Sequence, residues 1–362
     1  MTPRLELDRP RLEANCRRMR AAVRRRGARF RPHLKTAKSE AVARAALGDA
    51  AFRGAAVATL EEAAYFVAHG FDDLTYAVAI TPAKLERVAS IQGEGTVAIL
   101  TDEPAVATAI AAHGARFSVW LEVDSGQHRG GRAPDDPALL EAARRIEAAP
   151  RAAVAGVLTH AGHSYGARGA AAIARVAAEE RDAAVEAASR IRAAGISCPE
   201  VSVGSTPTAL FAEDLSGVTE VRAGVHVFMD LFQHAIGVCA RDELALSVVA
   251  SVLHRREDAV WIDAGTLSLS SERSLDAVGG GGFGEVTRLD GSPLPGAPRV
   301  DALNQEHGKV VATEGALPLE ALPVGAEVRV WPNHACITAA MFDRYHVVEG
   351  GRLVAEWPRL RG

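Results

Sequence analysis

The stretch "AVAGVLTHAGHSYGARGAAAIARVAAEE", residues 153–180, contains the unit that decides the fold. A short apolar run over 153–159 predicts a buried strand, and the alanine-rich segment 168–194 predicts a helix. A loop that carries glycine and histidine joins the two. A helix that separates two strands forces the strands to pair in parallel. The stretch therefore predicts one strand–helix unit of a parallel sheet.

The same alternation recurs along roughly the first two-thirds of the chain. Candidate strands lie near residues 28–32, 53–58, 74–79, 96–100, 117–123, 153–159, 200–203 and 218–222. Helical patterns lie between most of them, at 39–47, 60–69, 83–90, 104–113, 136–148 and 168–194. Eight such units close into a (β/α)8 barrel. We therefore expect an α/β fold whose main domain is a TIM barrel.

The last third of the chain has a different pattern. Three segments predict strands without long helices between them: "LALSVVASVLHRR", "DAVWIDAG" and "EVRVW". Glycine and proline are frequent at 278–298, which indicates a loop. We expect a barrel over residues 8–235 and a separate β-domain over residues 236–362. The N-terminal residues 1–7 are expected to join the β-domain as an extra strand.

The composition argues against several classes of protein. The formal net charge is -4 at pH 7, which gives no reason to expect nucleic acid as a partner. No segment reaches the roughly 18 apolar residues that a membrane span needs, and no apolar signal-peptide core follows the start. The four cysteines are scattered without a repeated spacing. We therefore expect a reducing, cytoplasmic location rather than a disulfide framework.

A lysine follows the first candidate strand. In such barrels the reactive groups lie on loops that leave the C-terminal ends of the strands. The segment "RPHLKTAKS" places Lys35 there, beside His33 and Lys38. Nearby cations and partial desolvation favour a neutral amine, which can form a Schiff base. A surface lysine in a basic stretch is an equally good interpretation.

Glycine and hydroxyl residues follow strands seven and eight, which is the usual phosphate position in these barrels. The segment "GSTPT" starts at Gly204, and "AGVH" ends at residue 226. Gly204 allows a close backbone approach, while Ser205 and Thr206 offer hydroxyl and amide donors to an anion. A plain tight turn is the alternative. A Schiff-base lysine and a phosphate cradle at one barrel mouth together indicate pyridoxal phosphate.

Other candidate site residues lie on two further loops. Arg129 stands in a glycine-rich loop, where its guanidinium could hydrogen-bond the phenolic oxygen of the cofactor. His160, His163 and Tyr165 crowd the next loop, where each is a candidate acid, base or ring neighbour. Loop solvation is the alternative for each of these residues.

The segment "PNHACITAAM", residues 332–341, places His334 and Cys336 two positions apart. If the extended geometry of the preceding strand persists, both side chains project from the same face. Imidazole and thiolate together suit zinc. Two ligands are too few for a closed structural site, so a catalytic site with open positions is the remaining metal interpretation. Ordinary core filling is the alternative. Glu306 and His307 in "NQEHG" are either supporting partners or loop residues.

These motifs together resemble a known family. The chain is similar to the zinc- and pyridoxal-phosphate-dependent D-serine dehydratases of the eukaryotic type. These enzymes group with the D-threonine aldolases among the alanine-racemase-fold enzymes, known as fold type III. The resemblance covers nearly the whole chain and rests on separate motifs in the same order, which are "RPHLKT", "GSTPT", "RAGVHVFMD", "QEHG" and "PNHACITAAM".

The resemblance implies roles for individual residues. Lys35 corresponds to the Schiff-base lysine and Arg129 to the partner of the cofactor oxygen, and His334 and Cys336 correspond to the zinc ligands. Further cofactor-contacting positions match Tyr165, Thr206, Gly224 and Val225. The family also implies a homodimer. Two departures touch the cofactor environment, since Leu158 and His226 stand where tyrosines are common in the family.

The resemblance implies β-elimination of water from D-serine, which gives pyruvate and ammonia. Lys35 would remove the Cα proton, and the metal would help the hydroxide to leave. D-threonine aldolase is the nearest alternative, but aldolases of this group tend to have Asp at the position of Cys336. A 3-hydroxyaspartate dehydratase or aldolase would differ in substrate. The β-domain argues against a non-catalytic pyridoxal-phosphate carrier, and alanine racemase chemistry needs no metal.

Overall fold

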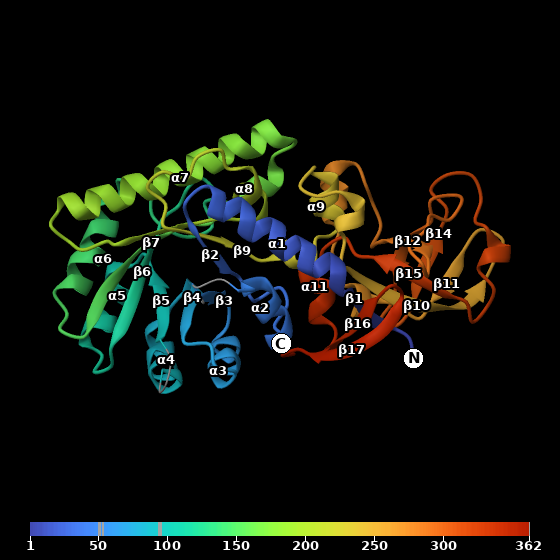
Figure 1. The fold of residues 1–362 in the computed structure, drawn as a ribbon, viewed down its shortest axis with the longest axis horizontal. Helices are drawn as coiled ribbons and strands as arrows, with labels where there is room; N and C mark the ends of the chain where they lie inside the picture. Colours follow the sequence, from blue (N-terminus) through green and yellow to red (C-terminus); the bar gives the residue numbers. More distant parts are fainter. Residues whose placement is uncertain (50–51, 53, 93–95, 362) are drawn as a thin grey trace. The chain divides into compact units, whose positions relative to one another are not determined.

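Eight strands form a parallel sheet in the described part of the chain, in the order β2-β9-β8-β7-β6-β5-β4-β3 (Figure 1). The computed structural model describes residues 1–49, 52, 54–92 and 96–361. The strands are β2 (Arg29–Pro32), β3 (Ala55–Val57), β4 (Asp73–Ala79), β5 (Thr96–Thr101), β6 (Phe117–Glu122), β7 (Ala152–Leu158), β8 (Glu200–Val203) and β9 (Glu220–Ala223). A bridge between His33 and Ala56 joins the two ends of this order, so the sheet is a nearly closed barrel.

The predicted (β/α)8 barrel is confirmed, and each predicted strand corresponds to an observed one. The second candidate strand was predicted to begin at residue 53, which lies outside the described residues. Helices alternate with the strands, namely α1 (Arg9–Arg25), α2 (Glu40–Leu47), α3 (Leu60–Ala68), α4 (Leu85–Ile91), α5 (Pro104–Ala112), α6 (Pro137–Glu147), α7 (Ala170–Ala193) and α8 (Thr206–Phe211). Because a helix connects each strand to the next, successive strands run in the same direction and pair in parallel.

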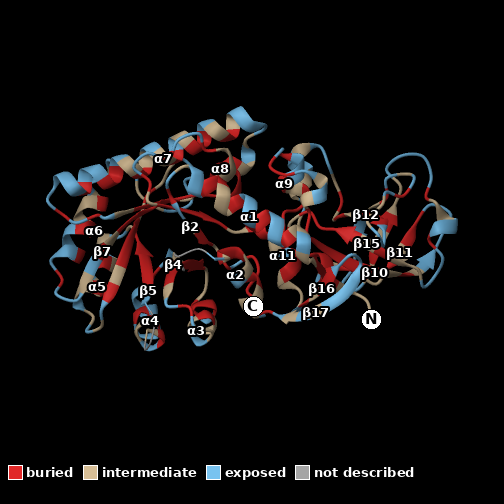
Figure 2. Ribbon diagram, viewed as in Figure 1, coloured by how far each residue is buried: buried red, intermediate tan, exposed pale blue. Residues whose placement is uncertain are grey.

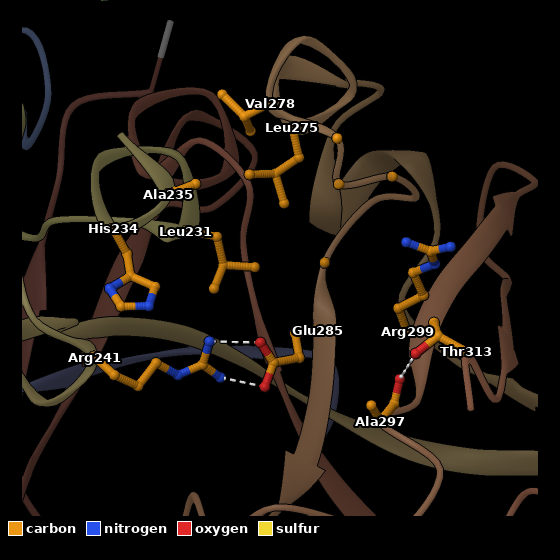
Figure 3. Close-up of a pocket in the computed structure, with 14 residues that line it drawn as sticks. Leu231, His234, Ala235, Arg241, Leu275, Val278, Glu285, Ala297, Arg299 and Thr313 are labelled. Carbon is orange, nitrogen blue, oxygen red and sulfur yellow. Dashed lines mark hydrogen bonds and ion pairs between the residues drawn. The ribbon is translucent and has the colours of Figure 1, made fainter. Parts of the chain in front are cut away.

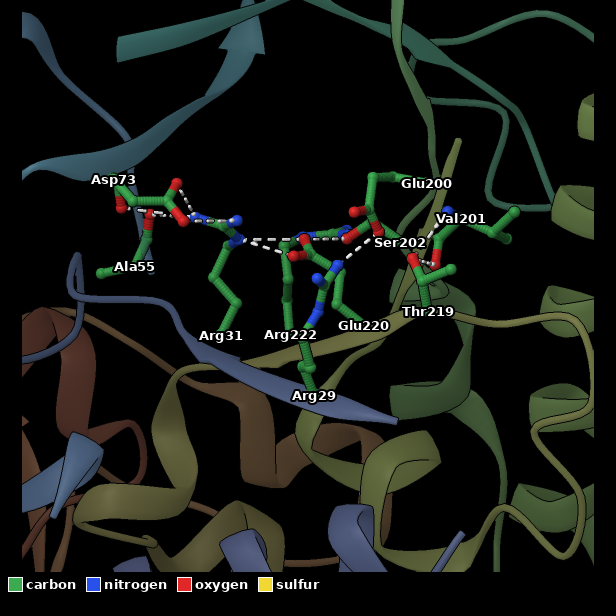
Figure 4. Close-up of polar contacts among 10 residues, drawn as sticks. All are labelled: Arg29, Arg31, Ala55, Asp73, Glu200, Val201, Ser202, Thr219, Glu220 and Arg222. Carbon is green, nitrogen blue, oxygen red and sulfur yellow. Dashed lines mark hydrogen bonds and ion pairs between the residues drawn. The ribbon is translucent and has the colours of Figure 1, made fainter. Parts of the chain in front are cut away.

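Charged side chains fill part of the barrel interior, where most barrels have aliphatic layers. Arg31 and Glu220 are both buried, and Nε of Arg31 lies 2.8 Å from Oε2 of Glu220. Arg31 also donates to Oδ1 of Asp73 over 2.8 Å. Ser202 extends the network by donating its hydroxyl to Glu220 over 2.6 Å (Figure 4). Buried charges persist only when they are paired, and this network pairs them.

A second sheet has nine strands within the described residues, in the order β11-β14-β13-β12-β15-β10-β1-β16-β17. They are β1 (Arg4–Asp8), β10 (Leu246–Arg255), β11 (Val260–Ile262), β12 (Glu285–Arg288), β13 (Arg299–Leu303), β14 (Gly308–Val311), β15 (Glu327–Trp331), β16 (Arg344–Glu349) and β17 (Arg352–Pro358). Because β11 also pairs with β10, strands β10 to β15 close on themselves. The N-terminal strand β1 pairs with β10 and β16.

The chain forms two compact units. One consists of Met1–Cys16, Thr36–Ala45 and Val225–Gly362, and the other of Arg17–Lys35 and Ala46–Gly224. Buried residues line both sheets (Figure 2). The chain passes from one unit to the other between Lys35 and Thr36. Domain boundaries at 7/8 and 235/236 stay a prediction of the sequence. Among the described residues, no helix is both long and apolar enough to cross a membrane.

Candidate functional site

Lys35 lies directly after β2, at the C-terminal end of the barrel strand, and its side chain is exposed. The backbone just before it is fixed by the barrel. The amide of His33 donates to the carbonyl oxygen of Ala223 over 2.8 Å, and the amide of Leu34 donates to Ala56 over 2.7 Å. Lys35 therefore stands on rigid backbone at the barrel end where reactive groups are found.

Two histidines beside Lys35 are held in their neutral form. Burial lowers the pKa of His33 well below its ordinary value, and the charges of Lys35, Arg222 and Arg129 lower it further. Burial and the same cations lower the pKa of His160 to about 3, although Nδ1 of His160 lies 2.9 Å from the carbonyl oxygen of Gly204. The three cations thus act on one small region of the barrel end, and the imidazoles add no charge to it.

Arg222 was not recognised from the sequence. The residue is 3% exposed, and its guanidinium donates to the hydroxyl of Ser202 (Figure 4). It also donates to the carbonyl oxygen of Thr159. Burial lowers the pKa of Arg222 to about 10, while the carboxylates of Glu220 and Glu180 oppose that effect. A signal was available in the sequence, because an arginine inside the short apolar strand "EVRAG" is rarely buried without a partner.

The turn after β8 holds the predicted phosphate residues, but two of their amides are engaged within the protein. The amide of Gly204 donates to Oε1 of Glu180 over 2.8 Å, and the amide of Ser205 donates to Oγ1 of Thr208 over 3.0 Å. Ser205 caps α8 through a capping box with Thr208. An anion at this turn would therefore be held by donors other than these two amides.

Gly204 serves the packing of two strands. Its φ is +132°, and a Cβ atom at this position would lie 2.2 Å from the carbonyl oxygen of Arg222. Only glycine fits so close an approach in this conformation. The sequence attributed this glycine to the approach of a ligand, whereas the structure shows the approach of the neighbouring strand β9.

Glu180 is a second residue that the sequence did not reveal. Its carboxylate is buried on α7 and accepts hydrogen bonds of 2.8 Å from the amides of Ala161 and Gly204. It therefore joins the loop after β7 to the turn after β8. A glutamate in an alanine-rich helix gives no local sign of this task, because both partners lie on loops of other segments.

The remaining predicted cofactor residues lie on the same loops. Tyr165 is half-buried in the 3-10 turn Gly162–Gly166, and Thr206 is buried at the first position of α8. The amides of Gly224 and Val225 make no hydrogen bond to any described residue. Of the two departures from the family pattern, His226 is 0% exposed and Leu158 packs in an apolar cluster with Trp120.

These residues fit an anionic cofactor that carries a phosphate group. Lys35, Arg129 and Arg222 supply positive charge, and His33 and His160 stay neutral between them. Hydroxyl residues and glycine form the turn at the ends of β8 and β9. Cations with hydroxyl and amide donors are the chemistry that recognises phosphate. An aldehyde on the same cofactor would have the amine of Lys35 as its partner.

His334 and Cys336 are not part of an extended segment, so that prediction is wrong. His334 is the extended N-cap residue of helix α11 (Ala335–Ala340), and Cys336 lies in the first turn of that helix. The two side chains nevertheless act on each other, since each shifts the pKa of the other. The backbone changes from extended at His334 to helical at Cys336, and this change brings the two side chains together. The sequence had predicted the same closeness from the alternation of side chains along a strand.

His334 and Cys336 shift each other's pKa. Burial alone would lower the pKa of His334, but the Cys336 thiolate and the carboxylate of Asp230 raise it to about 9. Burial opposes ionisation of Cys336, but His334 and the hydroxyl of Thr36 together lower the pKa of the thiol. Each group therefore stabilises the charged form of the other. A divalent cation bound by both side chains would displace a proton from them.

Asp230 holds the pair in place. It is the N-cap residue of helix α9 (Leu231–Ala235), where Oδ1 accepts from the amide of Gln233 over 2.8 Å. Oδ2 accepts from the amide of Ala335, between His334 and Cys336, over 3.0 Å. The motif "RAGVHVFMD" contains this residue, but the sequence assigned the motif to the phosphate side. Its contacts belong with the predicted metal pair.

Thr36 completes the surroundings of Cys336. Its hydroxyl oxygen lies 3.2 Å from the sulfur of Cys336, and the side chain is 1% exposed. Thr36 follows Lys35 in the chain. The residue that contacts the cysteine is therefore joined by one peptide bond to the proposed cofactor lysine.

The donors at His334 and Cys336 fit a soft divalent cation. Thiolate and imidazole are the usual zinc ligands, and the carboxylate of Asp230 adds negative charge nearby. In the described ranges, no group of three or more His, Cys, Asp or Glu side chains is placed to hold a metal. Glu306 and His307 lie on a turn whose backbone pairs with Thr266 and Leu267, for example Thr266 N to Asn304 O at 2.9 Å. No described contact joins them to the pair.

A pocket of about 410 Å³ lies in the unit that carries the second sheet (Figure 3). Its walls include Leu231, His234, Leu275 and Arg299. Arg241 and Glu285 form a bidentate ion pair in it, with distances of 2.5 and 2.6 Å. None of the predicted site residues lines this pocket, so it is separate from the candidate site.

Two family models match the chain. The first is "Alanine racemase, N-terminal domain", over residues 7–231. The second is "Putative serine dehydratase domain", over residues 245–348. Together they cover the barrel and most of the second sheet.

Similar proteins are dehydratases and aldolases. D-threo-3-hydroxyaspartate dehydratase of Delftia sp. (strain HT23) is 42% identical over 100% of this chain and 97% of that protein. D-threonine aldolase of Arthrobacter sp is 32% identical over 98% of the chain and 91% of that protein. D-serine dehydratase of Dictyostelium discoideum is 27% identical over 92% of the chain and 90% of that protein.

Solved structures agree with this grouping. The Delftia dehydratase superposes with a TM-score of 0.96 at 41% identity and covers 100% of this chain and 98% of its own. A cysteine-to-alanine variant of a D-threo-3-hydroxyaspartate dehydratase is known in a metal-free form. Alanine racemase of Clostridium difficile 630 superposes with a TM-score of 0.72 at 14% identity over 99% of both chains, which shows a shared fold.

Proposed function

Because the chain belongs to the alanine racemase N-terminal domain family and continues into a serine dehydratase domain, we propose that it is a metal-assisted, pyridoxal-phosphate-dependent lyase that removes water from a 3-hydroxy D-amino acid. Its relatives are lyases, so the chain is an enzyme of that class. The observation that carries the proposal is the contact of Thr36 with Cys336, since Thr36 is the neighbour of Lys35.

The sequence alone favoured D-serine as the substrate, and the comparisons change the order of the candidate substrates. Identity is 42% to the D-threo-3-hydroxyaspartate dehydratase and 27% to the D-serine dehydratase, each over nearly full length. We therefore place D-threo-3-hydroxyaspartate first and D-serine second. Cys336 supports a dehydratase over a D-threonine aldolase, because the family resemblance implies Asp at this position in aldolases.

The proposed roles follow from the surroundings of each residue. Bound pyridoxal phosphate supplies an electron sink for the carbanion at Cα. Lys35 would hold the cofactor, and its amine would take the proton from Cα. Arg129 and Arg222 provide positive charge, while neutral His33 and His160 avoid excess charge beside the amine.

The phosphate group would be bound at the ends of strands β8 and β9. Gly204 and Ser205 shape the turn there, while Thr206, Gly224 and Val225 provide donors. Tyr165 lies on the neighbouring loop. Glu180 fixes that loop and the turn through the amides of Ala161 and Gly204.

His334 and Cys336 are proposed as the metal ligands. A divalent cation supplies Lewis acidity toward a hydroxyl leaving group. Hydroxide leaves poorly without such help, so the reaction gives the pair a specific task. The metal-free cysteine variant of the related dehydratase supports this role for Cys336. Zinc is the proposed metal, and the homodimer and the cytoplasmic location stay predictions of the sequence.

A substrate panel tests the proposal. Purified protein with pyridoxal phosphate and zinc would be incubated with D-threo-3-hydroxyaspartate, D-serine and D-threonine, with and without a chelator. We expect oxaloacetate and ammonia from the first substrate, a lower rate of pyruvate formation from D-serine, and loss of both activities with chelator. Glycine and acetaldehyde as the main products from D-threonine would replace dehydratase by aldolase. Activity that resists the chelator would remove the metal role.

A further inference from the structure

The carbonyl oxygen of Ala37 receives two side chains from the C-terminal part of the chain. The hydroxyl of Tyr345 donates to it over 2.6 Å, and Nε of Arg359 donates over 3.4 Å. Tyr345 is 0% exposed and Arg359 is 5% exposed. The guanidinium of Arg359 is itself fixed by the carbonyl oxygen of Phe342 at 2.7 Å. Because burial raises the pKa of Tyr345, its hydroxyl stays a donor throughout the physiological range.

The next residue, Lys38, is held in an unfavourable backbone conformation. Its φ is 48°, in the left-handed region that a lysine rarely adopts. The amide of Leu360 donates to its carbonyl oxygen over 2.7 Å, and the end of the chain runs beside this segment (Figure 1). Backbone strain of this kind persists where the surroundings fix the chain, and it is concentrated at functional sites.

The fixed segment is connected to both proposed chemical groups, to Lys35 along the chain and to Cys336 through a contact. On its N-terminal side, one peptide bond joins Thr36 to Lys35. The Thr36 hydroxyl lies 3.2 Å from the sulfur of Cys336. Consecutive Cα atoms stand about 3.8 Å apart. A displacement of Ala37 would therefore move the backbone that carries Lys35 and also the hydroxyl that contacts the cysteine.

We propose that Tyr345 and Arg359 are positioning residues that fix the backbone at Ala37. They thereby fix the backbone position from which the Lys35 side chain extends, and the contact of Thr36 with Cys336. This inference rests on the proposed function, in which Lys35 holds the cofactor and Cys336 holds a metal ion. Tyr345 stands 308 positions from Ala37 in the sequence. The C-terminal strands then serve the site directly, in addition to completing the second sheet.

The variant Tyr345→Phe tests this role. It keeps the ring that packs 5.5 Å from the ring of Phe228 and removes only the hydroxyl. In the zinc- and cofactor-loaded protein, we expect kcat to fall by about ten- to a hundredfold with KM changed by less than about threefold, since small misplacements of reacting groups act on the chemical step. The visible circular dichroism of the bound cofactor should weaken. The zinc concentration at half-saturation should rise by about tenfold.

A matched control is Tyr76→Phe. Tyr76 is equally buried, at 1% exposed, and its hydroxyl accepts from Lys84 over 3.2 Å in the barrel. This variant should lower the melting temperature to a similar extent and leave the dichroism and the zinc affinity unchanged. A second variant, Arg359→Met, removes the longer hydrogen bond and should give the same changes at smaller size. It also provides the test if Tyr345→Phe does not fold.

Three results would overturn the inference. The first is a Tyr345→Phe variant whose cofactor dichroism, zinc affinity and kcat equal those of the wild type. If Tyr345→Phe does not fold, the same result in Arg359→Met counts instead. The second is the same set of changes in Tyr76→Phe. The third is a wild-type protein that binds neither cofactor nor zinc, which overturns the proposed function as well. A wild-type protein that binds both but converts none of the three substrates contradicts the proposed function alone, because dichroism and zinc affinity still decide the inference.

Discussion

The carboxylate of Asp230 accepts a hydrogen bond of 3.0 Å from the amide of Ala335, the residue between His334 and Cys336. Asp230 is 3% exposed, and its charge contributes to the raised pKa of His334. The same carboxylate caps helix α9. One buried side chain therefore contributes both to the backbone position and to the electrostatics of the proposed metal ligands.

Replacing Asp230 by Asn separates these two tasks. Asparagine is also a good N-cap residue, so α9 should keep its cap. The negative charge is lost, and we expect zinc affinity to fall by about ten- to a hundredfold, as for other residues that support metal ligands. A competition titration against a chromophoric chelator measures this. Unchanged zinc affinity would show that Asp230 acts only as a helix cap.

Replacing Lys35 by Ala should abolish the visible absorbance of the lysine-bound cofactor and all lyase activity. The amine is the only group at this position that forms the covalent link, and it is also the proposed base. Lys84→Ala, on a surface turn of the barrel, is the matched control and should keep the spectrum. Persistence of the visible band in Lys35→Ala would show that another residue holds the cofactor.

The barrel was predictable from the sequence because most of its strands are short, largely apolar runs that alternate with amphipathic or alanine-rich helices. The position of Lys35 followed from that order alone. Asp230 and Glu180 could not be found in this way, since their roles depend on amides far along the chain. The predicted extended geometry of His334 and Cys336 was wrong. Helix α11 has only six residues and its N-cap residue His334 makes no side-chain cap hydrogen bond, so the usual sequence signals of a helix are weak there.

The glycine after β8 was identified from the sequence as a special position, and the structure gives a reason that the sequence did not show. Gly204 has a φ of +132°, and an added Cβ atom would lie only 2.2 Å from the carbonyl oxygen of Arg222, so there is no room for a side chain. The reason lies in strand β9, which is adjacent in space and distant in sequence. A single sequence shows that glycine is present but does not show which neighbour requires it.

Replacing Gly204 by Ala should therefore destabilise the protein. The unfavourable φ costs about 1–3 kcal/mol, and the contact with the Arg222 carbonyl must be relieved by a backbone shift. Cofactor affinity should fall with it, because the turn carries Ser205 and Thr206. Gly166→Ala is the matched control, since a Cβ atom there meets nothing within 4 Å. Urea unfolding of both variants checks this, and equal stability would contradict the packing argument.

Acid should destabilise the cofactor-free protein through its neutral histidines. The pKa of His160 is lowered to about 3 in the folded protein, against an ordinary value of 6.5. The unfolded chain therefore binds the proton first, and the stability contributed by neutral His160 is present above pH 6.5 and is lost as the pH falls from 6.5 toward 3. The limiting slope for one such group is about 1.4 kcal/mol per pH unit.

The variant His160→Gln isolates this contribution. Glutamine cannot take up a proton in this range, and its amide can still donate to the carbonyl oxygen of Gly204. The free energy of unfolding, measured by urea denaturation between about pH 4.5 and 7.5, should depend less steeply on pH in the variant. His33 remains and keeps part of the slope, because burial and the same cations lower its pKa as well. Identical slopes in variant and wild type would show that folding does not lower the pKa of His160, and would contradict the neutral, buried imidazole of the proposed site.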